Sequence, residues 1–341
     1  MTGYLATRLD FPTSAPSGFK MLEQEPQFDA TRHLQIEVPD QVLTLKELGY
    51  SDDQIAECPT PFGVTSIFRI LSDEGVACML DVARQLEEFT TSNARIARNV
   101  RGGVYRSKFL RDLYQCPELT AALSDICGIP VLPHTLPHQL GHLNYNPLEV
   151  GENVDKWHVD TLRIDFVMFV TDPKLVDGGE FEYYLGTKDE VAALTKAGKP
   201  LDPAKIVAPN MPGPGYAVLQ QGNMVVHRAK GLRKAGERIT MVNGYVPRDI
   251  TFPDFSRFDQ LYMVDPKDAA ASEYARHMTW MARERMTAEL DAFEFSEDKD
   301  AMAARLDAFA AHLTKAADDL RDAGDDLRDA GDAQTEHFGD G

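Results

Sequence analysis

Two residues near the middle of the chain have the types and the spacing of a chelating pair. His158 and Asp160 stand two positions apart at the start of the apolar run WHVDTLRIDFVMFV. Alternate residues of an extended strand point to the same face, so this pair could hold one metal ion. A single His-x-Asp pair is weak evidence, because a chain rich in acidic residues contains such pairs by chance. The pair indicates a metal site only if a third ligand can join it.

His227 can supply that third ligand. It follows the strand pattern YAVLQQGNMVV, whose turn is marked by Gly222 and Asn223. Two imidazoles and one carboxylate can hold Fe(II) on one face of an octahedron and leave the other positions open. Taken singly, a histidine at a strand end is usually a surface or hydrogen-bonded residue, and Asp160 could cap a turn. Taken together, the three residues predict a metal site and are the candidate catalytic residues.

A cationic residue follows on the next strand pattern. ERITM places Arg238 and Thr240 on one face of that strand. An arginine buried in a β structure is costly unless it meets an anion, and its planar fork suits a carboxylate, to which a nearby hydroxyl can add a hydrogen bond. The pattern therefore predicts that Arg238 and Thr240 bind an acidic cosubstrate.

The elements that must position these residues are short strands between about residues 131 and 255. They are rich in Val, Phe, Tyr and Thr and are separated by turn sequences such as DPKLVDGG, NMPGPG and QGN. Only KDEVAALTKAG reads as a helix within this block, so parallel crossovers are not favoured. The expected fold class is α+β, with a jelly-roll or barrel core over residues 131–255.

Helical patterns flank this block on both sides. We expect a mostly helical amino-terminal region over residues 1–130 that packs on the core, and carboxy-terminal helices over residues 256–324. The clearest segments are SDEGVACMLDVARQLEEFTTSNARIARN, which starts at Ser72, and SKFLRDLYQCPELTAALSDICG, which restarts at Pro117 and stops at Gly128. A shorter helix is expected within LTLKELGYSDDQIAEC.

The end of the chain is acidic and repetitive. Residues 296–341 carry 13 acidic residues and 5 Lys or Arg, and the sequence DDLRDAG occurs twice in succession from residue 318. One Leu per repeat makes a poor coiled-coil seam, and the Gly opposes a helix. We therefore expect residues 325–341 to form an acidic tail without fixed structure that turnover does not need.

Composition limits the classes of partner. A chain of 341 residues with 43% hydrophobic residues can form a sizeable core, and a net charge of −19 argues against nucleic-acid or anionic-membrane partners. No apolar stretch is long enough to span a bilayer, and MTGYLATRLDFPTS lacks a secretory apolar region, so we expect a cytoplasmic protein with a small-molecule substrate. The oligomeric state is open. The cysteines are expected to be reduced, mostly buried thiols: Cys58, Cys78, Cys116 and Cys127.

A second histidine group has the spacing of a helical ligand row. His134, His138 and His142 stand four apart, but Pro133 and Pro137 oppose a regular helix there. We expect these histidines to line a pocket rather than to bind a metal.

From His142 to Val246 the order of these motifs resembles that of the iron(II)/2-oxoglutarate-dependent oxygenases. In that superfamily the strands form a double-stranded β-helix, and an Arg with a Ser or Thr binds the distal carboxylate of 2-oxoglutarate. The resemblance implies Fe(II) as the metal, 2-oxoglutarate and O2 as cosubstrates, and the Gly-Gly-Glu of DGGEFEYYL as the usual hairpin exit. It also implies a further 2-oxoglutarate contact from LNYNPLEVG, for which Tyr145 is the first candidate and Asn144 and Asn146 are alternatives.

The same resemblance implies a reaction class. The run from WHVD to VNGYV is similar to that of microbial biosynthetic oxygenases acting on free amino acids, including the fungal enzymes that close valine to an aziridine. Hydroxylation of a small molecule, an amino acid or a derivative of one, is the expected reaction, with desaturation or cyclisation as variants. A cupin-like metalloenzyme that does not use 2-oxoglutarate, or a non-catalytic binding protein on the same barrel, are the alternatives. The sequence indicates no substrate-binding residues.

Overall fold

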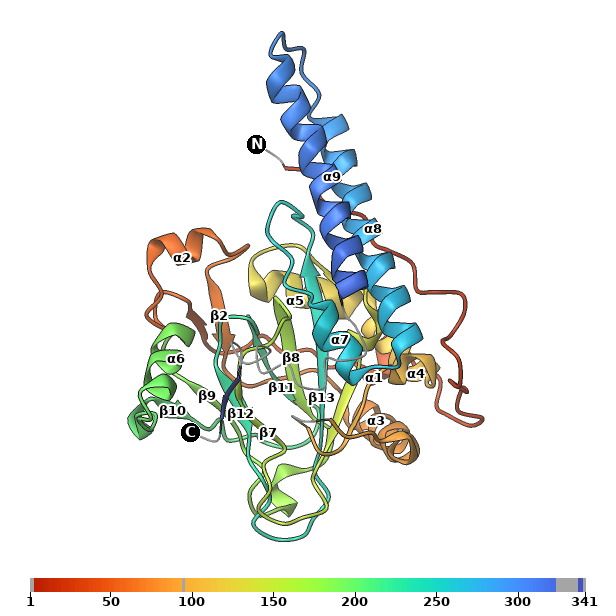
Figure 1. Ribbon diagram of the computed structural model, residues 1–341. Helices are drawn as coiled ribbons and strands as arrows, with labels where there is room; N and C mark the ends of the chain where they lie inside the picture. The colour runs from red at the N-terminus through yellow and green to blue at the C-terminus, as the bar shows by residue number, and fades with distance from the viewer. Residues whose placement is uncertain (1–2, 94–95, 323–336, 340–341) are drawn as a thin grey trace.

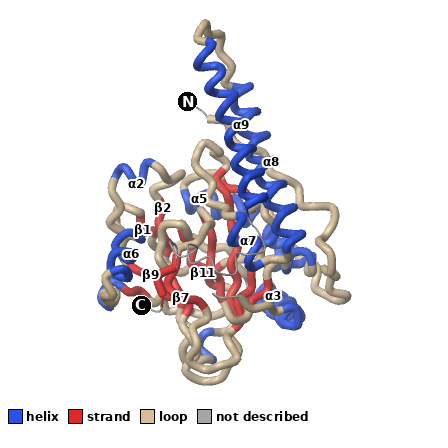
Figure 2. The backbone as a smooth tube through the Cα atoms, viewed as in Figure 1, coloured by secondary structure: helices blue, strands red, loops and turns tan. Residues whose placement is uncertain are grey.

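Two antiparallel sheets form the centre of the protein, and helices pack around them (Figure 1, Figure 2). The computed structural model describes residues 3–93, 96–322 and 337–339. This mixture of helices and antiparallel sheets confirms the α+β class predicted from the sequence.

The larger sheet has nine strands, in the order β1-β2-β11-β8-β13-β6-β4, with β3 paired to β11 and β5 paired to β13. The amino-terminal region, expected to be mostly helical, adds four short strands to this sheet. The bounds of the nine strands are β1 Val42–Thr44, β2 Phe62–Thr65, β3 Phe68–Arg69, β4 Asn99–Val100, β5 Val131–Pro133, β6 His142–Tyr145, β8 Ile164–Phe169, β11 Tyr216–Gln220 and β13 Ile239–Pro247.

The smaller sheet has five strands, in the order β10-β9-β12-β7-β14. Their bounds are β7 Asp155–His158, β9 Phe181–Tyr184, β10 Ile206–Val207, β12 His227–Ala229 and β14 His337–Gly339. The last strand lies within the segment 325–341, for which we expected no fixed structure. That expectation is wrong for residues 337–339, because they pair with β7; the rest of the segment lies outside the described residues.

The helices begin and end where local chemistry dictates. Ser72 caps α3, its side chain accepting from the Gly75 N–H, and α5 starts at Pro117 and ends where Gly128 adopts a φ of 69°. The bounds are α1 Ala30–His33, α2 Asp52–Ala56, α3 Asp73–Leu86, α4 Lys108–Tyr114, α5 Pro117–Cys127, α6 Lys188–Lys196, α7 Phe258–Val264, α8 Lys267–Asp291 and α9 Lys299–Asp322. Single 3-10 turns span Glu87–Phe89, Gly103–Tyr105, Pro137–Gln139, Pro173–Leu175 and Pro203–Lys205.

Strand alternation divides the core into two parts. On β8, Phe166 and Met168 join the hydrophobic cluster formed with helices α3, α4 and α5. The alternate residues Val167 and Phe169 face the other way and share a cluster with Phe181 of the smaller sheet. The inner faces of the two sheets therefore meet, and the space between them is where a site can be built.

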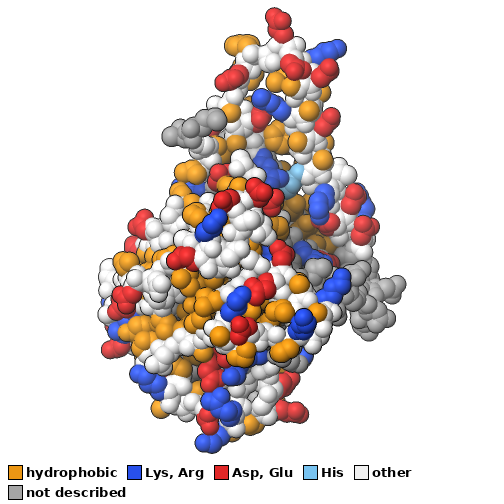
Figure 3. Space-filling view, turned by 90° about the vertical axis from the view of Figure 1, so that its left-hand side faces the viewer, with side chains coloured by type: hydrophobic (Ala, Val, Ile, Leu, Met, Phe, Trp, Pro, Cys, Tyr) orange, Lys and Arg blue, Asp and Glu red, His pale blue; other side chains and the backbone are white. Residues whose placement is uncertain are grey.

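Helices α8 and α9 lie side by side and project beyond the sheets (Figure 1). Figure 3 shows acidic, basic and hydrophobic side chains interspersed over this projection. Within the described ranges, none of the helices combines the length and the apolar character that crossing a bilayer requires. The four cysteines are free thiols, of which Cys58, Cys116 and Cys127 are buried, as predicted.

Candidate metal centre

The structure brings the three predicted metal ligands together. His158 and His227 are directly opposite each other on β7 and β12, with ring centroids 4.2 Å apart. Asp160 follows β7, and its backbone N–H donates to the Gly222 carbonyl at 2.9 Å. One ligand atom from each of the three side chains lies within 4.8 Å of the others. This convergence is the geometry that a single metal ion requires.

Both imidazoles present the same nitrogen to the carboxylate. The Nδ1–H of His158 donates to the Lys156 carbonyl at 2.6 Å, and that of His227 donates to the Val225 carbonyl at 2.9 Å. A carbonyl can only accept, so Nδ1 carries the proton, and in the neutral form of each ring the lone pair is on Nε2. These Nε2 atoms lie 3.5 Å and 3.3 Å from the Asp160 carboxylate oxygens, respectively. The rings are thus held ready for a ligand on the Asp160 side.

Two carboxyl groups at the site have pKa values that are shifted in opposite directions. Burial alone would raise the pKa of Asp160, but the imidazoles of His227 and His158 outweigh it and hold that pKa well below its usual range. Burial, and then the charge of Asp160, raise the pKa of Asp165 well above its usual range. Gln220 links Asp165 to the centre, because its amide donates to Asp165 at 3.0 Å and lies 3.2 Å from His227 Nε2. The pKa of Asp160 is therefore shifted in the direction that favours a charged metal ligand, and that of the neighbouring Asp165 in the opposite direction.

A further carboxylate lies beside the centre, and the sequence did not indicate it. Asp155 Oδ2 is 3.5 Å from His158 Nε2. Residues three apart on a regular strand point to opposite faces, but β7 has one residue more than β12 between their paired positions. This bulge reverses the alternation and turns Asp155 toward the metal side.

Arg238 has the surroundings of an anion-binding group. Its side chain is completely buried. Nε donates to the Gly179 carbonyl at 2.8 Å and Nη1 to the Thr240 hydroxyl at 3.1 Å. Nη2 is buried and has no hydrogen-bond partner among the described residues. Burial lowers the pKa of Arg238 to about 10, which still leaves it charged at neutral pH. A buried cation with an unused donor fits a carboxylate partner.

Gly179 makes room for this arginine. Its φ is +76°, and a Cβ at this position would lie 2.8 Å from Arg238 Cδ. A larger residue would therefore be strained and would displace the guanidinium. The Gly-Gly pair of DGGEFEYYL was thus a usable signal in the sequence, and its physical basis is close approach of the backbone to Arg238.

Tyr145 does not belong to this site, which corrects the first candidate for a cosubstrate contact. Its hydroxyl donates to the Ala83 carbonyl of α3 at 2.6 Å, on the outer face of the sheet. The alternate residue Asn144 points inward and lies opposite Thr240 on β13 and Asn99 on β4. The Oδ1 atoms of both asparagines are buried without a hydrogen-bond partner among the described residues. Asn146 caps the neighbouring turn, accepting from the Arg238 N–H at 3.1 Å.

The row of three histidines is dispersed rather than clustered. His138 Nδ1 lies 2.7 Å from Glu273 Oε1, and His142 lies on the inner face of β6 opposite Val242. His134 stacks on His277, and burial lowers the pKa of His134 to about 3. Among the described residues, these three side chains do not form one group of converging ligand atoms.

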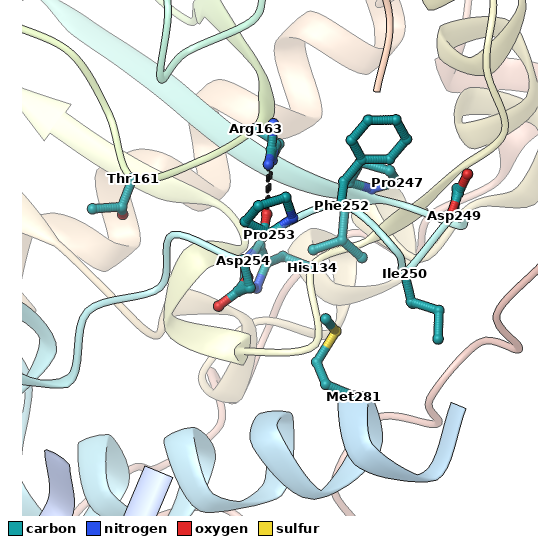
Figure 4. Close-up of a pocket in the computed structure, with 11 residues that line it drawn as sticks. His134, Thr161, Arg163, Pro247, Asp249, Ile250, Phe252, Pro253, Asp254 and Met281 are labelled. Atoms are coloured by element: carbon teal, nitrogen blue, oxygen red, sulfur yellow. Dashed lines mark hydrogen bonds between the residues drawn. The ribbon is translucent and has the colours of Figure 1, made fainter. Parts of the chain in front are cut away.

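His134 lines a small cavity at the end of β13 (Figure 4). Arg163 crosses one side and donates from Nε and Nη2 to the Pro253 carbonyl at 3.1 and 2.6 Å. The volume is about 20 Å³, which is room for about one water molecule. This cavity is therefore too small for an organic substrate.

Comparisons with known proteins add a partial likeness of fold. No family model and no curated protein matches the sequence. Similar solved structures include EctD from S. alaskensis with bound Fe, at 17% identity over 67% of this chain and 85% of that one, with a TM-score of 0.42. The non-haem alpha ketoglutarate dependent epimerase SnoN from nogalamycin biosynthesis is 15% identical over 61% of this chain and 87% of that one, with a TM-score of 0.41. HygX from Streptomyces hygroscopicus, with nickel and 2-oxoglutarate bound, is 14% identical over 60% of this chain and 87% of that one, with a TM-score of 0.39. These TM-scores are too low to indicate the chemistry of this chain, which is inferred from its own residues.

Proposed function

We propose that the protein is an iron(II)- and 2-oxoglutarate-dependent oxygenase of the double-stranded β-helix superfamily. It would oxidise a small molecule, an amino acid or a derivative of one. The observation that carries this proposal is the pairing of two features: three converging metal ligands, and a fully buried arginine whose Nη2 has no partner among the described residues. The first fits a divalent metal and the second fits a carboxylate, and 2-oxoglutarate needs both.

The residues present fit iron. His158, Asp160 and His227 would hold it through two Nε2 atoms and one carboxylate, a set that leaves positions open for other ligands. With 2-oxoglutarate and O2, iron in such a set supplies the oxidation of an unactivated C–H bond. The chain contributes the orientation of both rings through the Lys156 and Val225 carbonyls.

The residues present also fit 2-oxoglutarate. Arg238 and Thr240 would hold its distal carboxylate, since Nη2 is an unused donor and the Thr240 hydroxyl is within 3.1 Å of Nη1. The inward-facing Asn144 takes the place that Tyr145 had in the sequence prediction. Arg238 is closed off from solvent, and exclusion of water strengthens a charge-assisted hydrogen bond.

The decisive test is anaerobic. We expect the purified chain to bind one Fe(II), and 2-oxoglutarate added without O2 to produce a saturable visible absorption band. The same titration on the iron-free chain is the control and should give no band. Admission of O2 with a panel of amino acids should then release succinate in step with an oxidised product. Iron binding without a band would indicate a metalloenzyme that uses no 2-oxoglutarate, and absence of iron binding would favour a non-catalytic protein.

Substitutions of two neighbouring residues should show which face of β6 contacts 2-oxoglutarate. Tyr145→Phe should lower the free energy of unfolding by about 0.5 to 1.5 kcal/mol, because it removes one buried hydrogen bond, and should leave 2-oxoglutarate affinity unchanged. Asn144→Ala should weaken 2-oxoglutarate binding about 2- to 10-fold. Denaturant unfolding and the anaerobic titration would measure these effects. A loss of affinity in Tyr145→Phe alone would restore Tyr145 as the cosubstrate contact.

A further inference from the structure

The carboxy-terminal strand lies against the strand that carries a metal ligand. β14 pairs with β7, and His337 is directly opposite His158, with ring centroids 6.3 Å apart. Because directly opposite residues share a face, a transverse row of side chains crosses the inner face of the smaller sheet. The row consists of Val207, Tyr183, His227, His158 and His337. β14 thus ends the same row that holds both ligand imidazoles.

One side chain anchors this strand on the opposite face. Phe338 is 6% exposed and belongs to the hydrophobic cluster that contains Trp157 of β7 and Val191 of α6. Burial of a phenylalanine removes a large apolar surface from water, which helps to hold a three-residue strand in place. Docking of β14 therefore depends mainly on Phe338 and on pairing with β7.

We propose that β14 is a positioning element of the metal centre, with His337 closing the end of the row beside His158. In the described part of the sheet, β7 lies between β12 and β14. Without β14, β7 would be an edge strand with one side of its backbone unpaired, and His158 is its last residue. Loss of β14 would allow His158 to leave its position opposite His227. The inference takes from the proposed function only the metal at the three ligands.

Metal binding and docking of β14 should be thermodynamically linked. If docked β14 strengthens metal binding by some factor, then the metal strengthens docking of β14 by the same factor. Metal binding and strand docking can therefore be measured independently, one at the three ligands and the other at Trp157.

The first measurement uses Co2+ as a redox-stable probe of the ligand set. We expect full-length Phe338→Ala to bind Co2+ about 10-fold more weakly than the wild type, with an altered visible Co2+ spectrum, as for loss of other groups that orient metal ligands. Phe338→Leu should restore both. His337→Ala should bind Co2+ several-fold more weakly. Phe295→Ala is the matched control. Because Phe295 is 97% exposed, this substitution should change neither the Co2+ affinity nor the Co2+ spectrum.

The second measurement uses fluorescence. Trp157 and Trp280 are the two tryptophans of the chain, so Trp280→Phe leaves Trp157 as the reporter beside Phe338. On that background, Phe338→Ala should shift the emission to the red, and Co2+ should partly reverse the shift.

The outcomes distinguish this inference from the proposed function. Suppose that the Trp157 emission shows release of β14 while the Co2+ affinity and the Co2+ spectrum stay unchanged. That result would overturn the inference and leave the metal centre intact. Failure of the wild type to bind Co2+ would overturn both. If Phe338→Ala does not fold, His337→Ala decides, and a Co2+ affinity equal to that of the wild type would count against the proposal.

Discussion

The Asp160→Ala protein should fold and lose its iron. Asp160 is the carboxylate of the ligand set. Burial would raise its pKa, but the imidazoles of His227 and His158 outweigh burial and hold that pKa well below the usual range. Removal of a group that hydrogen-bonds a metal ligand lowers metal affinity about 10- to 100-fold. Removal of a ligand itself should therefore lower iron affinity about 100-fold or more. Turnover should fall below detection, because no other step can replace the metal. Iron content after desalting and far-ultraviolet circular dichroism would measure the two effects.

Asp155→Asn is the matched control for this experiment. Asp155 is the other carboxylate within 3.5 Å of His158 Nε2. The Asp155→Asn protein should retain iron, because the Asp155 carboxylate lies outside the set of converging ligand atoms. The reverse result, iron kept by Asp160→Ala and lost by Asp155→Asn, would replace Asp160 by Asp155 in the ligand set.

Arg238→Lys should weaken 2-oxoglutarate binding about 10- to 150-fold. The lysine keeps a positive charge but loses the planar fork, so the carboxylate would be held by one less directional contact. Loss of a charge-assisted hydrogen bond costs about 1.5 to 3 kcal/mol, which corresponds to that range. Iron affinity should not change, since the three ligands are untouched. Titration of 2-oxoglutarate into the anaerobic iron form gives the midpoint for each protein.

Arg233→Lys supplies the comparison in the same segment between β12 and β13. Arg233 is an exposed arginine paired with Asp177 and Glu180, so its substitution should leave the midpoint unchanged. Equal midpoints for Arg238→Lys and the wild type would show that Arg238 does not hold the cosubstrate. The function would then move toward a metalloenzyme without 2-oxoglutarate.

Local patterns in the sequence predicted those parts of the site that depend on local geometry. His158 and Asp160 are close in the chain, and Arg238 and Thr240 share a face because they are two apart on one strand. The assignment of Tyr145 failed because a shift of one residue exchanges the two faces of a strand. Asn144, one position earlier on the same strand, points inward.

Other features depend on contacts that no local pattern encodes. Asp155 turns inward only because β7 carries an extra residue relative to β12, and that bulge is a property of the pair of strands. β14 is three residues long and pairs with a strand about 180 residues earlier in the chain. Such a short strand has no periodicity to detect, and its stability comes from Phe338 and its tertiary neighbours.

The hydrogen bonds that orient the two ligand rings have a consequence for how the protein tolerates mutation. Their acceptors are the main-chain carbonyls of Lys156 and Val225, so these two hydrogen bonds do not depend on the side chains at positions 156 and 225. Every amino acid supplies the same carbonyl, and changes of side chain at these two positions can accumulate without turning the rings. A one-residue insertion or deletion in β7 or before β12 would have the opposite effect, because it moves the acceptor itself. The orientation of the two rings thus tolerates substitution at positions 156 and 225 but is sensitive to changes in the length of the chain around them.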